Sequence, residues 1–296
     1  MKRGLALRYS QPVSVVCNDA GAANLLIYYL SKYNNLELIP FMTGPAKNIW
    51  KNHFPKIEIT DSLESALENS KLAITGTGWM TDLEYDARML AQEMSIKSIA
   101  ILDNWTNYNS RFIRNEKKIL PDELWVFDEY ALTKATIKFP NILTVLKQNH
   151  YLESMVKSSK LIKKPKTPYL LYLTQPMGSN WGKGIAGEFQ ALDLFIQNIE
   201  NIVNSSKYDL VLRLHPSETK QKYKEFLKKY DVTFAFDDCN DISTSIGMAQ
   251  WVVGCDTYAM AIALSAGKEV FTSIPSWGPN SNLPHKGIKS LRFTGA

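Results

Sequence analysis

The sequence predicts an α/β protein made of two parallel-sheet halves that face a central cleft, and three observations lead to that prediction. From residue 13 onward, short apolar runs alternate with longer stretches of helical spacing, which is typical of a parallel sheet covered by helices on both faces. The alternation stops near residue 151 and starts again at residue 169. The chain has 296 residues, enough for two domains of ordinary size.

The first half, residues 1–150, holds six predicted strands. They are Val13–Cys17, Leu36–Met42, Lys56–Ile59, Leu72–Thr75, Ser98–Leu102 and Leu124–Phe127. Helical spacing follows three of them, at Leu25–Leu30, at Ser62–Asn69 and in a stretch that runs through Met94. This order predicts a Rossmann-like domain.

The second half, residues 169–296, repeats the alternation. Its predicted strands are Tyr169–Thr174, Tyr208–Leu214, Val232–Phe236, Trp251–Val253 and Glu269–Thr272. Its predicted helices are Glu188–Val203, Ser217–Tyr230, Ile242–Met248 and Tyr258–Ala266, and Ser217 is placed to cap the second of these. Between the halves, residues 151–168 combine five lysines with two prolines, which predicts a solvated basic linker.

Composition narrows the class of protein. An apolar share of 45 % excludes a disordered chain. The net charge of +5 does not by itself imply that the protein binds nucleic acid, and it is compatible with small anionic ligands. Three scattered cysteines support neither a disulfide framework nor a zinc site. The apolar stretch after Lys2 and Arg3 is broken at Arg8, and no stretch approaches a membrane span, so a cytoplasmic protein is expected. The lysines of the linker and of the predicted helix Ser217–Tyr230 have two interpretations. They form either a face that contacts an anionic membrane leaflet or a face that is simply solvated.

Polar residues gather where strands of the first half end. The turn after Val13–Cys17 contains Asp19, Gly21 and Asn24, which predicts either a tight turn with Asp19 as a helix cap or a ligand-binding loop with Asp19 as a carboxylate in a cleft. The turn after Leu72–Thr75 contains Gly76, Thr77, Gly78 and Trp79, with Glu84 beyond it; its glycines allow a ligand to approach the backbone, and the alternative is simple helix initiation. The third turn contains Asp103, Asn104, Trp105 and Arg111, a mixture that suits carbohydrate hydroxyls and ring faces.

The second half has its sharpest feature at Arg213-Leu214-His215-Pro216-Ser217. A strand delivers His215 to its carboxyl end, and Pro216 suits the start of a helix. There His215 and Arg213 can bind a phosphate and stabilise a departing nucleotide, although a lone histidine is more often a packing residue. Gly254, Asp256 and Thr257 precede a small-residue helix, an arrangement typical of an anion site or of an ordinary N-cap.

Two short motifs in the second half resemble those of GT-B-fold bacterial glycosyltransferases. Leu212-Arg213-Leu214-His215-Pro216 is similar to the His-Pro motif of sialyltransferase-like and Kdo-transferase-like enzymes, which use CMP-activated acidic sugars in capsule and lipopolysaccharide assembly. Asp256-Thr257 is similar to their Ser/Thr phosphate-binding motif. The double-acidic-glycine motif of some sialyltransferases is absent. The resemblance implies a nucleotide-sugar donor on the second half and a glycan or lipid-linked acceptor on the first.

The same resemblance implies roles for individual residues. His215 and Thr257 would contact the donor phosphate, and an acidic residue of the first half would be the general base, with Asp19 as first choice and Glu84 and Asp103 behind it. The site residues expected beside the donor are Arg213, Pro216, Ser217, Gly254 and Asp256. Those expected beside the acceptor are Gly21, Asn24, Gly76, Thr77, Gly78, Trp79, Asn104, Trp105 and Arg111.

These residues lead to a predicted metal-independent glycosyltransferase without a cofactor. Asp237-Asp238 is the nearest approach to a metal-binding acidic pair, and its position before a helix favours an ordinary loop. Two alternatives stay open: a UDP-sugar epimerase or hydrolase of the same fold, which would act without an acceptor, and a nucleotide-sugar or carbohydrate-binding protein without catalysis. The sequence does not identify the sugar, the acceptor or the oligomeric state.

Overall fold

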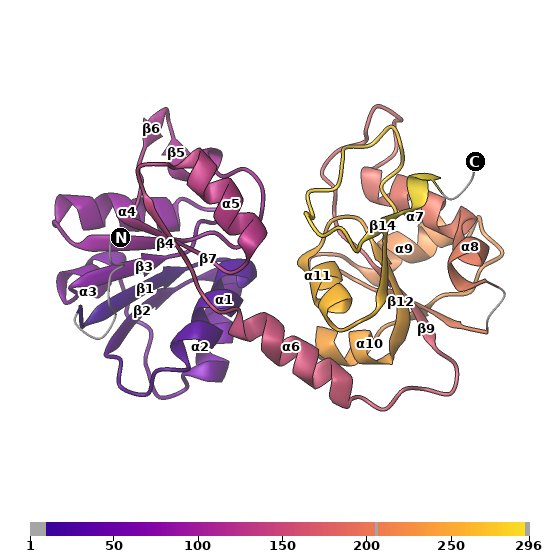
Figure 1. Ribbon diagram of the computed structural model, residues 1–296, viewed down its shortest axis with the longest axis horizontal. Helices are drawn as coiled ribbons and strands as arrows, with labels where there is room; N and C mark the ends of the chain where they lie inside the picture. The colour runs from indigo at the N-terminus through magenta and orange to yellow at the C-terminus, as the bar shows by residue number, and fades with distance from the viewer. Residues whose placement is uncertain (1–9, 205–206, 294–296) are drawn as a thin grey trace. The chain divides into compact units, whose positions relative to one another are not determined.

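A computed structural model of the chain describes residues 10–204 and 207–293 (Figure 1). The described residues fall into two compact units, which divide between Tyr151 and Leu152. Lys2, Arg3 and Arg8, which entered the prediction about the N-terminus, lie outside the described residues. No helix within residues 10–204 and 207–293 has the length and apolar character that crossing a bilayer requires.

The first unit is built on a six-stranded parallel sheet in the order β2-β1-β3-β4-β7-β8. Its strands are β1 (Val13–Cys17), β2 (Leu38–Met42), β3 (Leu72–Thr75), β4 (Lys97–Ile101), β7 (Glu123–Val126) and β8 (Leu143–Leu146). A short antiparallel hairpin, β5 (Ile113–Arg114) with β6 (Lys117–Lys118), lies between β4 and β7 in the chain. The central strands β1 and β3 are buried along their whole length, which explains their continuous apolar runs.

Five α-helices connect the strands of the first unit. They are α1 (Ala20–Leu30), α2 (Gly44–His53), α3 (Leu63–Glu68), α4 (Leu83–Glu93) and α5 (Glu129–Lys138). Helix α1 packs against α2, and α3 packs against α4. The chain crosses from β1 to β2 in one direction and from β3 to β4 in the other, so right-handed connections place α1 and α4 on opposite faces of the sheet. The main core of this unit lies around β1, α1 and Trp50.

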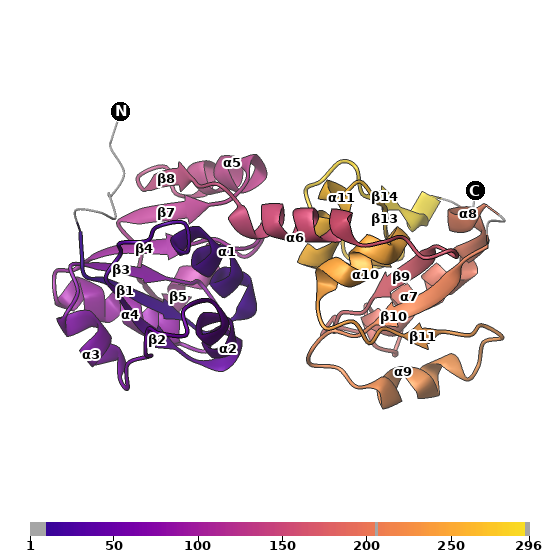
Figure 2. The same ribbon diagram turned by 90° about the horizontal axis from the view of Figure 1, so that it is seen from below.

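The second unit repeats the architecture with the sheet order β11-β10-β9-β12-β13-β14, again all parallel. Its strands are β9 (Tyr169–Leu173), β10 (Asp209–Arg213), β11 (Ala235–Phe236), β12 (Ala249–Gly254), β13 (Glu269–Thr272) and β14 (Lys289–Ser290). Its helices are α7 (Gly187–Gln197), α8 (Ile199–Val203), α9 (Lys220–Leu227), α10 (Ile242–Met248) and α11 (Tyr258–Ser265). Helices α10 and α11 cover one face of this sheet, and α7, α8 and α9 cover the other (Figures 1 and 2).

The predicted fold class, two Rossmann-like parallel sheets, is confirmed, while several elements differ from the prediction. Residues 56–59 form no strand, and residues 44–53, for which no helix was predicted, form α2 with Pro45 in its first turn. The single helix predicted over Glu188–Val203 is divided at Asn198 into α7 and α8. Thr219, and not Ser217, caps α9.

Residues 151–168, predicted as a linker, contain most of helix α6 (His150–Leu161). Leu152, Met155, Val156 and Ser159 are buried or half-buried, at a spacing that repeats with the helical turn, whereas Lys157 and Lys160 are exposed. The ring of Tyr151, at the start of α6, packs against Tyr28 of the first unit. Two of the five lysines therefore lie on the exposed side of a helix, and the other three follow its end.

Candidate functional site

In the first unit the predicted residues meet at the point where the direction of chain crossover reverses. Strand β1 lies between β2, which the chain reaches through α1, and β3, which it reaches later on the other side. In open α/β sheets, ligands bind at the carboxyl ends of strands at such a switch point. Asp19 follows β1, and Gly76, Thr77 and Gly78 follow β3, so both turns border it.

Asp19 is fixed by its role at the start of α1. Its backbone is extended, and its Oδ1 accepts a hydrogen bond of 3.0 Å from the backbone N–H of Ala22, which makes it the N-cap. Its other oxygen, Oδ2, lies toward the turn after β3, where a Cβ on Gly78 would approach it to 2.6 Å. The two functions considered for Asp19, a cap and a carboxylate at the site, are thus combined in one side chain.

Glu84 and Asp103 lie beside Asp19. Glu84, in the first turn of α4, is fully buried, and its Oε1 accepts a 2.8 Å hydrogen bond from the backbone N–H of Asn18. Its Oε2 is buried without a hydrogen-bond partner among the described residues. Both Glu84 oxygens and Oδ2 of Asp19 lie within 3.3 Å of the position that a Cβ on Gly78 would take. Oδ2 of Asp103 lies against Gly21 in the same way. We call Asp19, Glu84 and Asp103 the carboxylate cluster.

Crowding of negative charge changes the acidity of this cluster. Burial and the neighbouring Asp103 raise the pKa of Asp19 to about 7, against the opposing hydrogen bond from Ala22. Burial also raises the pKa of Glu84. A half-buried carboxylate that titrates near neutrality is suited to accept a proton from a hydroxyl group.

Two buried arginines support the turns that carry the cluster. Arg111 donates from Nη1 to Oδ1 of Asp103 at 2.6 Å and to Oγ1 of Thr77 at 2.9 Å. Arg88, in α4, donates to the carbonyl oxygen of Gly76 at 2.9 Å and is fully buried. Arg111 and Thr77 were predicted to contact an acceptor, whereas these bonds engage them within the unit.

The remaining residues predicted beside an acceptor have different surroundings. Trp79 is 69 % exposed next to the Gly76–Gly78 turn, so its ring is accessible. Asn104 accepts hydrogen bonds from the backbone N–H of Trp105 and from the hydroxyl of Thr106, which forms a local turn. Trp105 is buried, and its Nε1 donates to Asp128 at 2.9 Å. Asn24 is half-buried on α1.

In the second unit, His215 follows β10, next to the end of β9. Its backbone N–H donates to Oγ1 of Thr174 at 2.8 Å. The backbone N–H of Ser217 donates to Nδ1 of the ring at 3.3 Å, and the Ser217 hydroxyl lies 2.8 Å from the same nitrogen. Since Nδ1 accepts, the neutral ring carries its hydrogen on Nε2. Burial lowers the pKa of His215, which favours this neutral form. Pro216 and Ser217 are exposed beside it.

The turn after β12 contains Gly254, Asp256 and Thr257. Thr257 occupies the N-cap position of α11, but its hydroxyl makes no capping hydrogen bond. Asp256 receives four hydrogen bonds on its carboxylate, all from residues 281–283, and therefore anchors that loop. Gly254 packs tightly, because a Cβ there would lie 3.1 Å from Sδ of Met260.

Arg213 ends β10 and turns toward α10. Its Nη1 donates to Oδ2 of Asp237 at 2.7 Å and to Oγ of Ser245 at 2.8 Å. Asp237, Asp238 and Cys239 also form a group of metal-type ligand atoms within 4.8 Å of one another. Because Arg213 already neutralises Asp237, the group has a structural explanation.

No protein-family model matches the sequence, and no curated protein matches it either. Several solved structures share the fold. The UDP-GlcNAc 2-epimerase of Methanocaldococcus jannaschii is 12% identical with a TM-score of 0.61, over 88% of this chain and 83% of that one. The α/β-galactoside α-2,3-sialyltransferase of Photobacterium phosphoreum is 10% identical with a TM-score of 0.51, over 94% and 98%. The Neisseria meningitidis UDP-GlcNAc 2-epimerase bound to UDP-GlcNAc is 12% identical with a TM-score of 0.55, over 88% and 81%.

These similarities show the fold, which is of the GT-B type. Enzymes with different reactions share it, so the reaction has to be argued from the residues of this chain.

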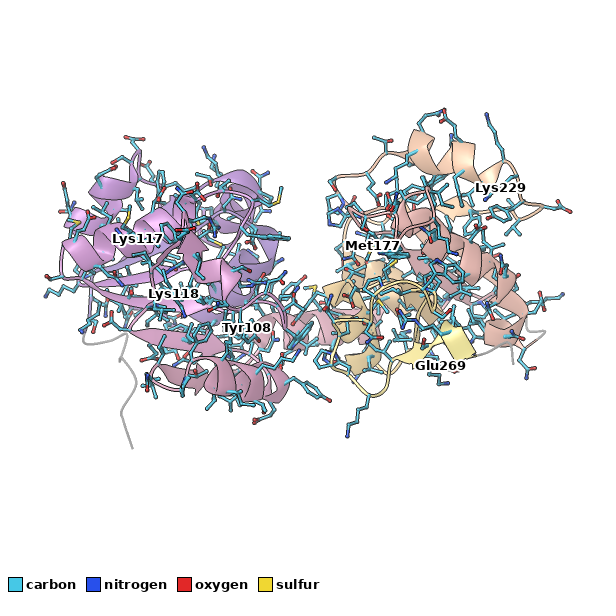
Figure 3. All side chains as sticks on the ribbon, turned by 90° about the horizontal axis from the view of Figure 1, so that it is seen from above. Tyr108, Lys117, Lys118, Met177, Lys229 and Glu269 are labelled. Atoms are coloured by element: carbon cyan, nitrogen blue, oxygen red, sulfur yellow. The ribbon has the colours of Figure 1, made fainter. Side chains whose placement is uncertain are left out.

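The structure also presents a loop that the sequence reasoning missed. Residues 174–186 connect β9 to α7 at the switch point of the second sheet, and Gly178, Gly182 and Gly184 adopt positive φ there. Gln175, in this loop, accepts a 3.0 Å hydrogen bond from the backbone N–H of Asp256. Met177, labelled in Figure 3, donates its N–H to Glu188. The glycine-rich run between a strand and a helix was the available signal.

Proposed function

We propose that the protein transfers a sugar from a nucleotide sugar to a hydroxyl group of a glycan or glycoconjugate. The favoured donor is a CMP-activated acidic sugar, and the favoured setting is the assembly of a surface polysaccharide. One observation carries the proposal: Asp19 is a half-buried carboxylate at the switch point of the first sheet, and its pKa is raised to about 7. Such a group is basic enough to take a proton from an acceptor hydroxyl, and it is ionised in about half of the molecules at pH 7.

In this mechanism Asp19 removes the hydroxyl proton as the oxygen attacks the anomeric carbon of the donor. The bond from that carbon to the phosphate breaks, and the nucleotide departs with the electron pair. We assign the developing phosphate charge to Nε2–H of His215, to the Thr257 hydroxyl and to the N-terminus of α11. The similar fold of a sialyltransferase supports sugar transfer, while these residue roles rest on the geometry of this chain.

Substitution of Asp19 tests the proposed base. Asparagine caps helices as well as aspartate does, so Asp19→Asn keeps α1 while it removes the base. We expect the rate of transfer to fall by about 10²- to 10⁴-fold, which is the usual contribution of a positioned base. The matched control is Asp241→Asn, because Asp241 is the N-cap of α10 and its carboxylate accepts hydrogen bonds from Ser243 and Thr244.

The assay follows the release of CMP, UDP and GDP from their nucleotide sugars, with and without a panel of glycan acceptors. Transfer that persists in Asp19→Asn at the rate of the control would overturn Asp19 as the base.

Epimerisation of a UDP-sugar is the second candidate, and the carboxylate cluster is the observation that favours it. Inversion at a ring carbon needs one group to remove a proton and another to return it, and burial raises the pKa values of both Asp19 and Glu84. The same fold occurs in UDP-GlcNAc 2-epimerases. Incubation of UDP-GlcNAc in D₂O without an acceptor separates the two reactions. Deuterium in the recovered sugar indicates the epimerase, and dependence on an acceptor indicates the transferase.

A further inference from the structure

A cavity of the first unit, broad and open to solvent, lies next to the carboxylate cluster along the chain. It has a volume of about 600 Å³ and is formed by the loop after β4 together with α5. The loop that lines it with Trp105 and Tyr108 also supplies Asp103 to the cluster and Arg111 as the partner of Asp103. Nε of Arg111 donates to the carbonyl oxygen of Thr106 at 3.1 Å, which ties the two parts of the loop together. A ligand of the size of one sugar residue fits this volume while part of it stays in contact with solvent.

The charged side chains that line this cavity are all positive. All the residues that line it are described, and among them only Lys134 and Lys138 are charged. Both are exposed on α5, and Nζ of Lys134 donates to the carbonyl oxygen of Trp105 at 3.1 Å, which holds this ammonium group at the rim. The rest of the lining includes the amides of Asn107 and Asn109. Two ammonium groups beside neutral amides favour an anionic ligand that also presents hydroxyl groups.

Tyr108 lines this cavity, and its hydroxyl group lacks a partner. The side chain, labelled in Figure 3, is only 7% exposed, and its hydroxyl has no hydrogen-bond partner among the described residues. The hydroxyl oxygen is itself buried, so a ligand reaches it only after the ring moves. Trp105 is 5% exposed, so the two aromatic rings present little free surface, and the lysines and asparagines supply the polar contacts of the cavity.

We propose that this cavity binds an acidic sugar residue, one that carries a carboxylate or a phosphate, of the acceptor. Lys134 and Lys138 bind the anionic group, and the asparagine amides bind the ring hydroxyls. The identity of the bound residue as part of an acceptor rests on the proposed transferase function. The shared chemistry of the ligand is an anionic group on a sugar ring.

Three monosaccharides with the same ring test this site: glucuronic acid, glucose 6-phosphate and glucose. Binding to the full-length protein is followed by NMR at the indole N–H of Trp105. We expect at least one of the two anions to bind about 10-fold more tightly than glucose, and the tighter of them identifies the preferred group. Equal binding of all three sugars would overturn the site, as would inorganic phosphate that binds as tightly as glucose 6-phosphate.

The lysines are tested with Lys138→Gln and with Lys134→Gln/Lys138→Gln. Because both ammonium groups are exposed, each is expected to contribute about 2- to 5-fold to the affinity for the anion. The control is Lys51→Gln, on an exposed position of α2, which removes the same charge outside the cavity. An equal loss of affinity in the control would mean that only net charge matters and would overturn the site.

The result of these binding experiments does not depend on catalysis, because no nucleotide-sugar donor is present. Anion binding in a protein that shows no transfer would support the site and refute the transferase. Transfer to neutral and acidic acceptors at equal efficiency, without binding of either anion, would refute the site and leave the transferase.

Discussion

Asp19 holds its proton to a much higher pH in the folded protein than in the unfolded chain. An unperturbed aspartate titrates near pH 4, whereas burial and Asp103 raise the pKa of Asp19 to about 7. Between about pH 4 and pH 7 the unfolded state therefore releases this proton while the folded state retains it. Linkage then requires that this residue lowers the free energy of unfolding as the pH rises through that window, with no further change above it. The ionised carboxylate of Asp19, which the proposed reaction requires, therefore lowers the free energy of unfolding at neutral pH.

Asp19→Asn is consequently expected to be more stable than the wild type above pH 7. The difference should reach a few kcal/mol at pH 8, since one unit of pKa corresponds to about 1.4 kcal/mol. It should vanish below about pH 3, where Asp19 is protonated in both states. Urea unfolding of both proteins across pH 3–8 measures this difference. A variant that is less stable than the wild type at pH 8 would show that the carboxylate stabilises α1 more than its burial costs.

Single residues of the carboxylate cluster could be foreseen because they follow strands, and strand ends of a parallel sheet meet at one edge. Asp19, Glu84 and Asp103 follow β1, β3 and β4 in this way. The hydrogen bonds that Arg111 and Asp256 make within their units could not be foreseen. Arg111 bonds Thr77 across 34 residues, and Asp256 bonds residues about 25 positions away, so only the folded chain shows these pairings.

At the scale of elements, Arg213 connects the end of β10 to the region before α10. It pairs with Asp237, whose side chain is only 2% exposed. Burial alone would raise the pKa of Asp237, but hydrogen bonds from Ser245 and Arg213 outweigh it and hold the pKa below its usual value. The pair therefore stabilises the position of α10 against β10 through a buried charge.

Removal of this guanidinium should weaken the second unit. Arg213→Met leaves Asp237 buried without its partner, and such a change costs about 3–5 kcal/mol. Adding Asp237→Asn should restore part of the loss, because the uncompensated charge is then gone. Urea unfolding of the two variants gives both values, with Lys224→Met on the exposed side of α9 as the control. Wild-type stability of Arg213→Met would contradict the stabilising role of this ion pair.

Element boundaries were predictable where a short apolar run ended in a turn, as in β1, β3 and β13. They were missed where polar residues mask a half-buried helix. In α6, exposed lysines interrupt the apolar positions, and in α2 the Gly44-Pro45 pair suggested only a turn. Residues 56–59 were predicted as a strand from their β-branched residues, but they form no ladder with the edge strand β2; the segment meets β2 just beyond them, where the backbone N–H of Thr60 donates to the carbonyl oxygen of Pro40 at 2.9 Å.

At the scale of the whole molecule, each unit has polar residues at the switch point of its sheet, but the chemical character of these residues differs between the two units. The switch point of the first sheet carries acidic groups, and that of the second carries Gln175, Thr257 and a glycine-rich loop next to His215. An excess of carboxylates disfavours a phosphate, whereas helix N-termini and N–H donors favour it. The nucleotide is therefore expected on the second unit.

Binding of free nucleotides tests that assignment on the intact chain. A ligand that binds only the folded state at 100 times its dissociation constant adds about 2.7 kcal/mol to stability, which raises the melting temperature by several degrees. We expect CMP to give the largest increase among CMP, UDP, GDP and CDP. Hydrogen exchange with CMP bound should slow in residues 174–186 and 254–258 and stay unchanged in the turns at residues 18–24 and 76–82. Protection of those first-unit turns would place the nucleotide at the carboxylate cluster and overturn the assignment. An equal response to all four nucleotides would retain the phosphate site and remove the preference for a CMP-activated donor.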